Sequence, residues 1–387
     1  REPVRASQRI YTWTSPWAIK HREALADLLP SAVLDDADSV MKKSFAPNTL
    51  TSYAAGPLRF TQYCDLRNIP EDQRMPASEI LIAGFVGYHC GKVSGSCIKN
   101  WLSGLKAWFE FHGAAWPGDT PEIKMARYAA KKEGTAHKRA SRHPISTNHL
   151  HTLHRALDFR IPFHCAIWAL AVTAFRACRR LGELTIPSLN GFNPTYHATR
   201  DSASLTFSSK HLDSAHFHIP WTKTTKSDGA NIVVTGLPSS HPDSALCAVA
   251  ALRQHWSANS KVPGTFSLFA FIDSDGKPQH MRKSVFLNFC YSIWQRAGMQ
   301  HVLGHSFRIG GAVDLLLAGV APEVVAATGG WTSLAFLLYW RRLEHLLPLH
   351  IAQAYDKRKL EDIHQLMERY RETNKIPKAY LDIEDSV

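Results

Sequence analysis

Closely spaced cysteine pairs are absent from this sequence. Its seven cysteines are scattered over 387 residues, and no two of them form a C-x-x-C pair. This pattern argues against a structural zinc site and against the disulfide framework of small secreted proteins. Cys90 and Cys97 lie near His89, but buried thiols explain them better than metal ligands do. We therefore expect a reduced, intracellular protein that needs no metal and no cofactor.

Long apolar runs and acidic clusters are also missing. No segment is long and apolar enough to cross a bilayer, and no secretory signal is recognisable. No group of Asp and Glu residues suggests a site for two metal ions. Acidic residues number 33 against 45 basic ones, which gives a formal net charge of +12. The excess favours a polyanionic partner, and we expect no association with membranes.

The segment richest in chemistry is residues 301–342. His305 and Arg308 stand three residues apart, so a helix that begins just before them places both side chains on one face. A guanidinium can bind two oxygens of a phosphate, while an imidazole can donate to one or move a proton. Trp331 and Tyr339 follow, eight residues apart. Each residue alone would more often be structural, but the combination points to phosphate chemistry.

In this order and spacing the residues resemble the tyrosine recombinase family, also called the phage-type integrases. The motif GHSFRIGGA…AGV…GGWTS…Y is most similar to the recombinases of Cryptons and DIRS-like retrotransposons. It is also similar to Cre recombinase, which has Trp where many relatives have His. The gap from Trp331 to Tyr339 is one residue shorter than in Cre and matches the Crypton spacing. The resemblance implies that Tyr339 is the nucleophile.

Two further segments resemble the family's pattern. Arg180 stands three residues before Glu183, as the first catalytic arginine does in the family's R-x-x-E segment. Arg179 is a competing neighbour, as is Arg176, but neither has an acid at that spacing. Lys223 stands where the family places a catalytic lysine on a β-hairpin, with Lys226 as its competitor. The strands expected around this hairpin are Ala203–Ser208, Ala215–Thr222 and Ala230–Thr235.

The implied reaction is transesterification of DNA without a metal. Tyr339 would attack the scissile phosphorus, form a 3′-phosphotyrosyl link and release a 5′-hydroxyl. Arg180 and Arg308 would bind the non-bridging oxygens, and Lys223 would protonate the leaving oxygen. His305 would assist proton transfer, and Trp331 would orient the helix that carries the tyrosine. Glu183 would support Arg180.

Helical periodicity and charge suggest the domain organisation. Ile98, Trp101, Leu105 and Trp108 recur at helical spacing, and Ile80, Leu81, Phe85 and Val86 form the inward stripe of another expected helix. We expect a mainly α fold with a small antiparallel sheet, arranged as a C-shaped clamp on DNA. The expected parts are an N-terminal extension (1–36), a helical core-binding domain (37–123), a basic linker (124–143), an α+β catalytic domain (144–350) and a C-terminal helical tail (351–387).

The linker and the tail each suggest a partner. The linker region holds one acid and seven cations: Lys124, Arg127, Lys131, Lys132, Lys138, Arg139 and Arg142. We expect the cations to contact DNA phosphates. The alternative is a linker whose charges are only solvated. In the tail an apolar stripe covers one face of a charged helix, and it could pack on its own domain or on a neighbouring protomer: Leu360, Ile363, Met367 and Tyr370.

Together these features predict a nuclear, site-specific recombinase of a mobile element that integrates or excises DNA. Its expected partners are double-stranded DNA and further copies of the chain, as a dimer on one site and a tetramer in synapsis. Two alternatives stay open. One is a domesticated DNA-binding protein that has lost activity, and the other is a strand nicking-closing enzyme resembling a type IB topoisomerase.

Overall fold

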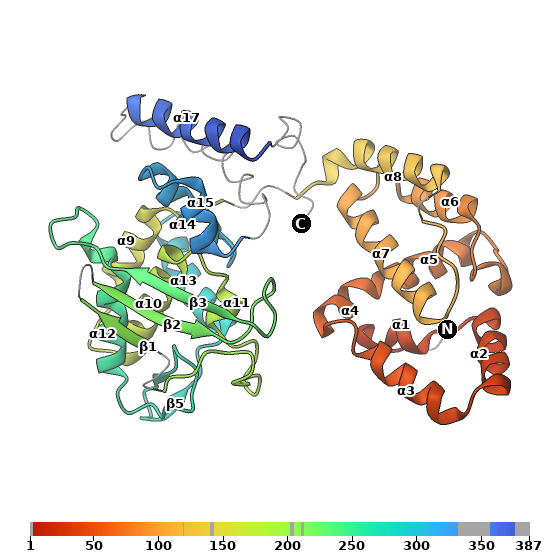
Figure 1. Ribbon diagram of the computed structural model, residues 1–387, viewed down its shortest axis with the longest axis horizontal. Coiled ribbons are helices and arrows are strands. Elements are labelled where there is room, and N and C mark those ends of the chain that lie inside the picture. Colours follow the sequence, from red (N-terminus) through yellow and green to blue (C-terminus); the bar gives the residue numbers. More distant parts are fainter. Residues whose placement is uncertain are drawn as a thin grey trace. The chain divides into compact units, whose positions relative to one another are not determined.

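The computed structural model describes residues 3–118, 120–139, 143–201, 205–209, 213–331 and 357–375 (Figure 1). The chain divides into two compact units, Arg1–Ala140 and Ser141–Val387. Each unit has a hydrophobic core of its own. Within the described residues no helix is both long and apolar enough to cross a membrane.

The first unit consists of helices over its described residues. Apart from short 3₁₀ turns, its elements are α1 (Arg9–Thr12), α2 (Pro16–Leu28), α3 (Ser31–Lys42), α4 (Pro47–Tyr53), α5 (Ala55–Leu66), α6 (Glu79–His89), α7 (Gly95–Phe111) and α8 (Pro121–Glu133). The central helix is α7, whose apolar positions are buried as their spacing predicted: Ile98, Trp101, Leu102, Leu105, Trp108 and Phe109. Gly104 allows α4 to approach closely, because a Cβ there would overlap the carbonyl oxygen of Tyr53.

The segment expected to be a separate N-terminal extension packs instead within this unit. Trp13 is only 8% exposed, and its carbonyl accepts a 2.7 Å hydrogen bond from the indole Nε1 of Trp108. Ser15 caps α2 by accepting from the backbone N–H of Ala18. The sequence showed little periodicity here because the helices α1 and α2 bury few side chains each.

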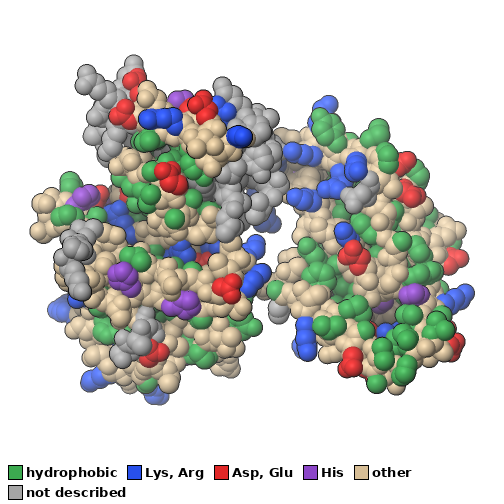
Figure 2. All heavy atoms as spheres, in the orientation of Figure 1, with side chains coloured by type: hydrophobic (Ala, Val, Ile, Leu, Met, Phe, Trp, Pro, Cys, Tyr) green, Lys and Arg blue, Asp and Glu red, His purple; other side chains and the backbone are tan. Residues whose placement is uncertain are grey.

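Most of the segment expected to be a linker forms helix α8 and the 3₁₀ turn Gly134–His137, both in the first unit. Ile123 and Ala130 are buried in the core, Ala126 packs against it half-buried, and the remaining residues of α8 are exposed. Figure 2 shows Lys and Arg side chains gathered over this helix. Two buried positions are enough to hold a helix that is otherwise charged, and the sequence pattern gave little sign of them. Arg142 lies outside the described residues.

The second unit is α+β. Its longer elements are α9 (Thr147–Ala156), α10 (Pro162–Arg176), α11 (Leu181–Leu184), β1 (Leu205–Ser208), β2 (Ser214–Ile219), β3 (Ala230–Thr235), α12 (Ala248–Ala258), α13 (Lys283–Arg296), α14 (Ser306–Leu317), α15 (Pro322–Gly329) and α17 (Lys357–Thr373). A small two-stranded ribbon pairs β4 (Phe271–Ile272) with β5 (Pro278–Gln279). The expected class, mainly α with a small antiparallel sheet, is confirmed.

The sheet has the order β1-β2-β3, and all its pairs are antiparallel. Leu205 opposes Phe217, which opposes Ile232, so one face of the sheet is apolar. This face packs with α10 and α12, and residues Cys165 to Phe175 of α10 are all buried in the resulting core. Because α10 is buried on all sides, its C-terminal end is fixed firmly, and this end leads directly into the candidate site.

Candidate functional site

Helix α14 carries the His305–Arg308 pair. His305 is the N-cap of α14, and Arg308 lies one turn into the helix. Gly310 and Gly311 let the helix pack closely, because a Cβ at Gly310 would overlap the carbonyl oxygen of Ile145 and one at Gly311 would overlap that of Phe175. The two glycines therefore let α14 pack directly against the segment before α9 and the end of α10, and Arg308 is 0% exposed there.

Arg308 joins three elements. Its Nη1 donates to the carbonyl oxygen of Cys178 at 3.0 Å and to that of Gly329 at 2.7 Å. Its guanidinium carbon lies 3.9 Å from the ring centroid of Trp331, which is the geometry of a cation–π contact. The structure thus brings together Arg308 and Trp331, two residues that the sequence placed in one site. It also shows Trp331 covering the arginine.

The turn between α10 and α11 positions the next arginines. Helix α10 ends in a Schellman motif, in which the N–H of Arg179 donates to Ala174 at 2.9 Å and the N–H of Cys178 donates to Phe175 at 3.1 Å. Cys178 takes the left-handed conformation of this motif, with φ of +50°. The turn directs the Cys178 carbonyl toward Arg308 and places Arg180 two residues further on.

Arg180 and Glu183 are in direct contact. Nη1 of Arg180 donates to Oε1 of Glu183 at 2.9 Å, and the backbone N–H of Arg180 donates to Oε2 at 3.2 Å. The side chain of Arg180 is 31% exposed, whereas that of Glu183 is 6% exposed. A buried carboxylate therefore holds Arg180 through its backbone N–H and its Nη1. The guanidinium is partly exposed and can still reach a ligand.

The two neighbouring arginines have different partners. Nη1 of Arg176 donates to Oδ2 of Asp314 at 2.6 Å, where burial raises the pKa of the Asp314 carboxyl. Arg179 is 3% exposed, and it donates through Nε to Ala177 at 2.9 Å and through Nη2 to the carbonyl of Thr328. Burial lowers the pKa of Arg179. Arg180 is thus the arginine of the three that pairs with Glu183.

Arg179 belongs to this site, although its sequence position marked it only as a competitor of Arg180. Helix α15 ends at Gly329, and Gly330 follows with φ of +67° as its C-cap. The carbonyls of Thr328 and Gly329 accept from Arg179 and Arg308 respectively. Two guanidinium groups therefore donate hydrogen bonds to the last carbonyls of α15 and complement the helix dipole. Three arginines within the five residues 176–180, shortly before Glu183, were the available signal, but they could not show which carbonyls the arginines meet.

Lys223 lies in the turn between β2 and β3, which is the type of location that the resemblance implied. Its side chain is exposed. The competing Lys226 closes the turn, since its backbone exchanges hydrogen bonds with Thr222 at 3.0 and 3.2 Å. Its Nζ lies 5.5 Å from the ring centroid of Trp221. Lys226 thus lies over an aromatic ring and is exposed, and Lys223 is exposed in the same turn.

The remaining predicted residue, Tyr339, lies in 332–356, outside the described residues. Among the described residues, no three His, Cys, Asp or Glu side chains gather in a way that could hold a metal ion. The described part of the site is therefore a cationic junction of the α10–α11 turn, α14 and the end of α15. Such a junction can bind and stabilise an anion such as a phosphate.

Comparison with known proteins finds similarity in structure but not in sequence. No protein-family model matches the chain, and no curated protein matches it in sequence. The structure is similar to the XerH site-specific recombinase bound to palindromic difH substrate in a post-cleavage complex, with a TM-score of 0.53, 12% identity and coverage of 88% of this chain and 93% of that one. A lambda integrase dimer bound to a COC′ core site also matches, with a TM-score of 0.48, 14% identity and coverage of 84% and 98%. The chain therefore shares the fold of the XerH site-specific recombinase.

Proposed function

We propose that this chain is a tyrosine-type site-specific recombinase of a mobile element, which cuts and rejoins double-stranded DNA during integration or excision. The observation that carries the proposal is the contact of Arg308 with the Cys178 carbonyl. This contact joins the helix of the H-x-x-R motif to the turn that bears Arg180 and Glu183. Residues that stand more than a hundred positions apart in the sequence thereby contribute to one cationic junction, inside a fold shared with a recombinase.

In this proposal the two arginines stabilise the phosphate on which the reaction takes place. Arg180 is braced by Glu183 and partly exposed, so it can bind a non-bridging oxygen directly. Arg308 is fully buried, with its guanidinium against the ring of Trp331. A phosphate can contact Arg308 only after Trp331 or its neighbours move. We therefore expect DNA binding to be accompanied by a local rearrangement around Trp331.

The other residues complete the reaction. The Tyr339 hydroxyl forms a bond to phosphorus while the bond from phosphorus to the 5′-oxygen breaks, and a 3′-phosphotyrosyl link results. Lys223 gives a proton to the leaving 5′-oxygen, and His305 takes the proton that the Tyr339 hydroxyl loses. A 5′-hydroxyl from another strand then reverses the reaction on a new partner. Because the intermediate conserves the phosphodiester energy, no nucleoside triphosphate is consumed.

The proposal extends to the setting of the reaction. Exchange between two duplexes requires several protomers, so we propose a dimer on one site and a tetramer in synapsis. The cations of the segment 124–142 would contact the DNA backbone in this assembly. A mobile element of a eukaryotic genome would place the protein in the nucleus.

The direct test is covalent trapping on DNA of unknown target sequence. The protein is incubated with a library of nicked duplexes of random sequence, denatured in detergent, and analysed for DNA that stays attached. We expect attachment by the wild-type protein and by the control variant Tyr355→Phe, and none by Tyr339→Phe, which should still bind DNA. Attachment by Tyr339→Phe would assign the nucleophile to another residue.

The same preparation separates the rival functions. Strand exchange between two duplexes that carry the selected sequence identifies a recombinase. Relaxation of supercoiled DNA without exchange identifies a nicking-closing enzyme. Sequence-specific binding with no covalent product identifies an inactive DNA-binding protein.

A further inference from the structure

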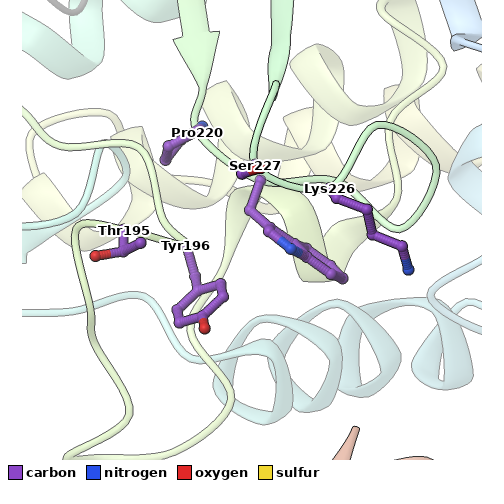
Figure 3. A pocket seen from close by; sticks show the side chains of 6 residues that line it. Thr195, Tyr196, Pro220, Lys226 and Ser227 are labelled. Atoms are coloured by element: carbon purple, nitrogen blue, oxygen red, sulfur yellow. The ribbon is translucent and has the colours of Figure 1, made fainter. Parts of the chain in front are cut away.

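A pocket lies beside the turn that presents Lys223. Its volume is about 410 Å³, and its lining comes from the loop before β1 and from the turn after β2: Thr195, Tyr196, Pro220, Trp221, Lys226 and Ser227. Thr195 and Tyr196 lie on one side of it, and Lys226 lies on the other (Figure 3). The volume falls in the range of about 300–1,000 Å³ that is usual for ligand sites.

The turn side of the pocket is held by a dense set of hydrogen bonds. Thr222 is 4% exposed, and its Oγ1 accepts from the backbone N–H groups of Thr224 at 3.2 Å and Thr225 at 3.0 Å. Its Oγ1 also lies 2.6 Å from the hydroxyl of Thr225. Lys226 takes a left-handed backbone conformation with φ of +55°, which directs the chain back into β3. The positions of Trp221 and Lys226 are therefore fixed by the turn itself.

The lining combines aromatic rings with a cation and lacks acids. Tyr196 is 49% exposed, although its ring centroid lies 6.0 Å from that of Trp221 at an interplanar angle of 70°. This edge-to-face pair is too close for a flat ligand to enter between the rings, and it leaves ring surface open to the pocket. The ammonium of Lys226 lies 5.5 Å from the centroid of Trp221. None of the six lining residues is acidic.

We propose that this pocket binds one unstacked base of a DNA strand, with Lys226 against the adjoining phosphate. A base has a flat apolar face that stacks on an exposed aromatic ring, and every base offers such a face. The phosphate beside it requires a cation, which Lys226 of the lining supplies. The hydroxyls of Thr195 and Ser227 can contact the base edge or sugar.

The inference rests on the proposed function, because the exchange of a strand supplies the ligand. A strand that leaves one duplex for another must unpair bases beside the break before it forms new pairs. Lys226 and Lys223 belong to the same short turn, so a base held by the pocket would lie near the lysine proposed to act on the leaving oxygen. The pocket would thus retain the freed end of the strand while it changes partners.

The test compares two synthetic duplexes by fluorescence anisotropy, one fully paired and one with a single unpaired thymidine. We expect the wild-type protein to bind the bulged duplex about tenfold more tightly, since stacking on one aromatic side chain commonly contributes that much. Tyr196→Ala and Trp221→Ala should each reduce this ratio toward one and leave affinity for the paired duplex unchanged. Trp221→Phe should keep most of the preference, and Lys277→Ala, which removes an exposed charge elsewhere, should keep all of it.

The outcomes separate this inference from the proposed function. Equal binding of both duplexes by the wild-type protein would overturn the base pocket and leave the recombinase proposal standing. A preference that survives in Tyr196→Ala and Trp221→Ala would also overturn it, because the extra base would then bind elsewhere. Failure to bind either duplex would overturn both proposals. Displacement of the bulged duplex by an acidic peptide, abolished in Lys226→Ala, would reassign the pocket to a protein ligand.

Discussion

The junction of the candidate site depends on the backbone conformation of one residue, Cys178. It occupies the position of a Schellman motif where glycine is usually found, with φ of +50°. Its side chain is fully buried, and burial raises the pKa of its thiol to about 12. The thiol is therefore an uncharged packing group, and the functional atom of the residue is its carbonyl oxygen, which accepts from Arg308.

We expect Cys178→Gly and Cys178→Val to have different consequences. Glycine relieves the left-handed strain but removes a small buried side chain, so these effects should nearly cancel in the free energy of unfolding. Valine is β-branched and poorly suited to positive φ, and it should destabilise the protein by about 1–3 kcal/mol. Thermal denaturation of both variants measures this. Equal destabilisation by both variants would mean that the thiol's packing, rather than the turn conformation, is what matters.

At this scale the sequence predicted some contacts and could not predict others. The resemblance of the R-x-x-E segment to the recombinase pattern implied that Glu183 supports Arg180, and the two side chains are in contact. It gave no sign that Arg308 would be 0% exposed, since arginine is rarely buried unless carbonyls from distant segments satisfy it. The carbonyls of Cys178 and Gly329 do so here, and their arrival at one point is a property of the fold.

At the scale of the element, helical periodicity succeeded where one face of a helix is buried. It identified the buried positions of α7, which alternate clearly with polar ones. It was wrong for Ile80 in α6, which is 68% exposed, while Ile82 is fully buried. Consecutive apolar residues at 80–82 fit more than one face of a helix, so the pattern could not choose among them.

Helix α17 is packed on its own chain. Ile363 is 6% exposed and Met367 is 1% exposed, and both belong to an apolar cluster with residues of α14 and α15 (Figure 1). We expect Met367→Ala to lower the free energy of unfolding of the monomer by about 2–5 kcal/mol, as other truncations of large buried side chains do. Thermal denaturation at low protein concentration measures this, with the exposed Gln365→Ala as control.

A different outcome would support exchange of this helix between protomers. If Met367→Ala leaves the monomer's melting temperature unchanged but weakens assembly on DNA that carries two sites, the helix covers a neighbour in solution. The apolar stripe alone could not decide between these alternatives, because an amphipathic helix needs a surface but does not specify whose.

Helix α8 provides the second prediction at this scale. Lys124, Lys131 and Lys132 are exposed on a helix that buries only Ile123 and Ala130 fully. If these lysines bind phosphates, changing all three to Ala should reduce the slope of log affinity against log salt by up to about 0.9 for each phosphate that is no longer neutralised. A matched triple variant of exposed lysines on or beside other helices should change it less: Lys20, Lys42 and Lys43. Equal slopes in both variants would mean that the lysines of α8 make no special contact with DNA phosphates.

For the whole molecule, the formal net charge of +12 favours binding of a polyanion. Half of this excess falls within residues 124–142, and three arginines precede the buried Glu183 in the second unit. The acids of the site brace cations, as Glu183 and Asp314 do, and are not gathered as metal ligands among the described residues. We therefore expect charge stabilisation by the protein to come from guanidinium groups.

We accordingly expect covalent attachment to DNA to proceed in excess EDTA. Arg180→Ala and Arg308→Ala should each slow it by about 10²–10³-fold, the usual consequence of removing one donor to a transition-state oxyanion. Because Arg308 is buried, its variant needs a check by thermal denaturation, and Arg308→Lys tests whether a single charge can replace the fork. Arg160→Ala, which changes an exposed arginine, serves as control. A strict requirement for magnesium in the attachment step, with Arg180→Ala fully active, would show that a metal ion and not this arginine stabilises the phosphate.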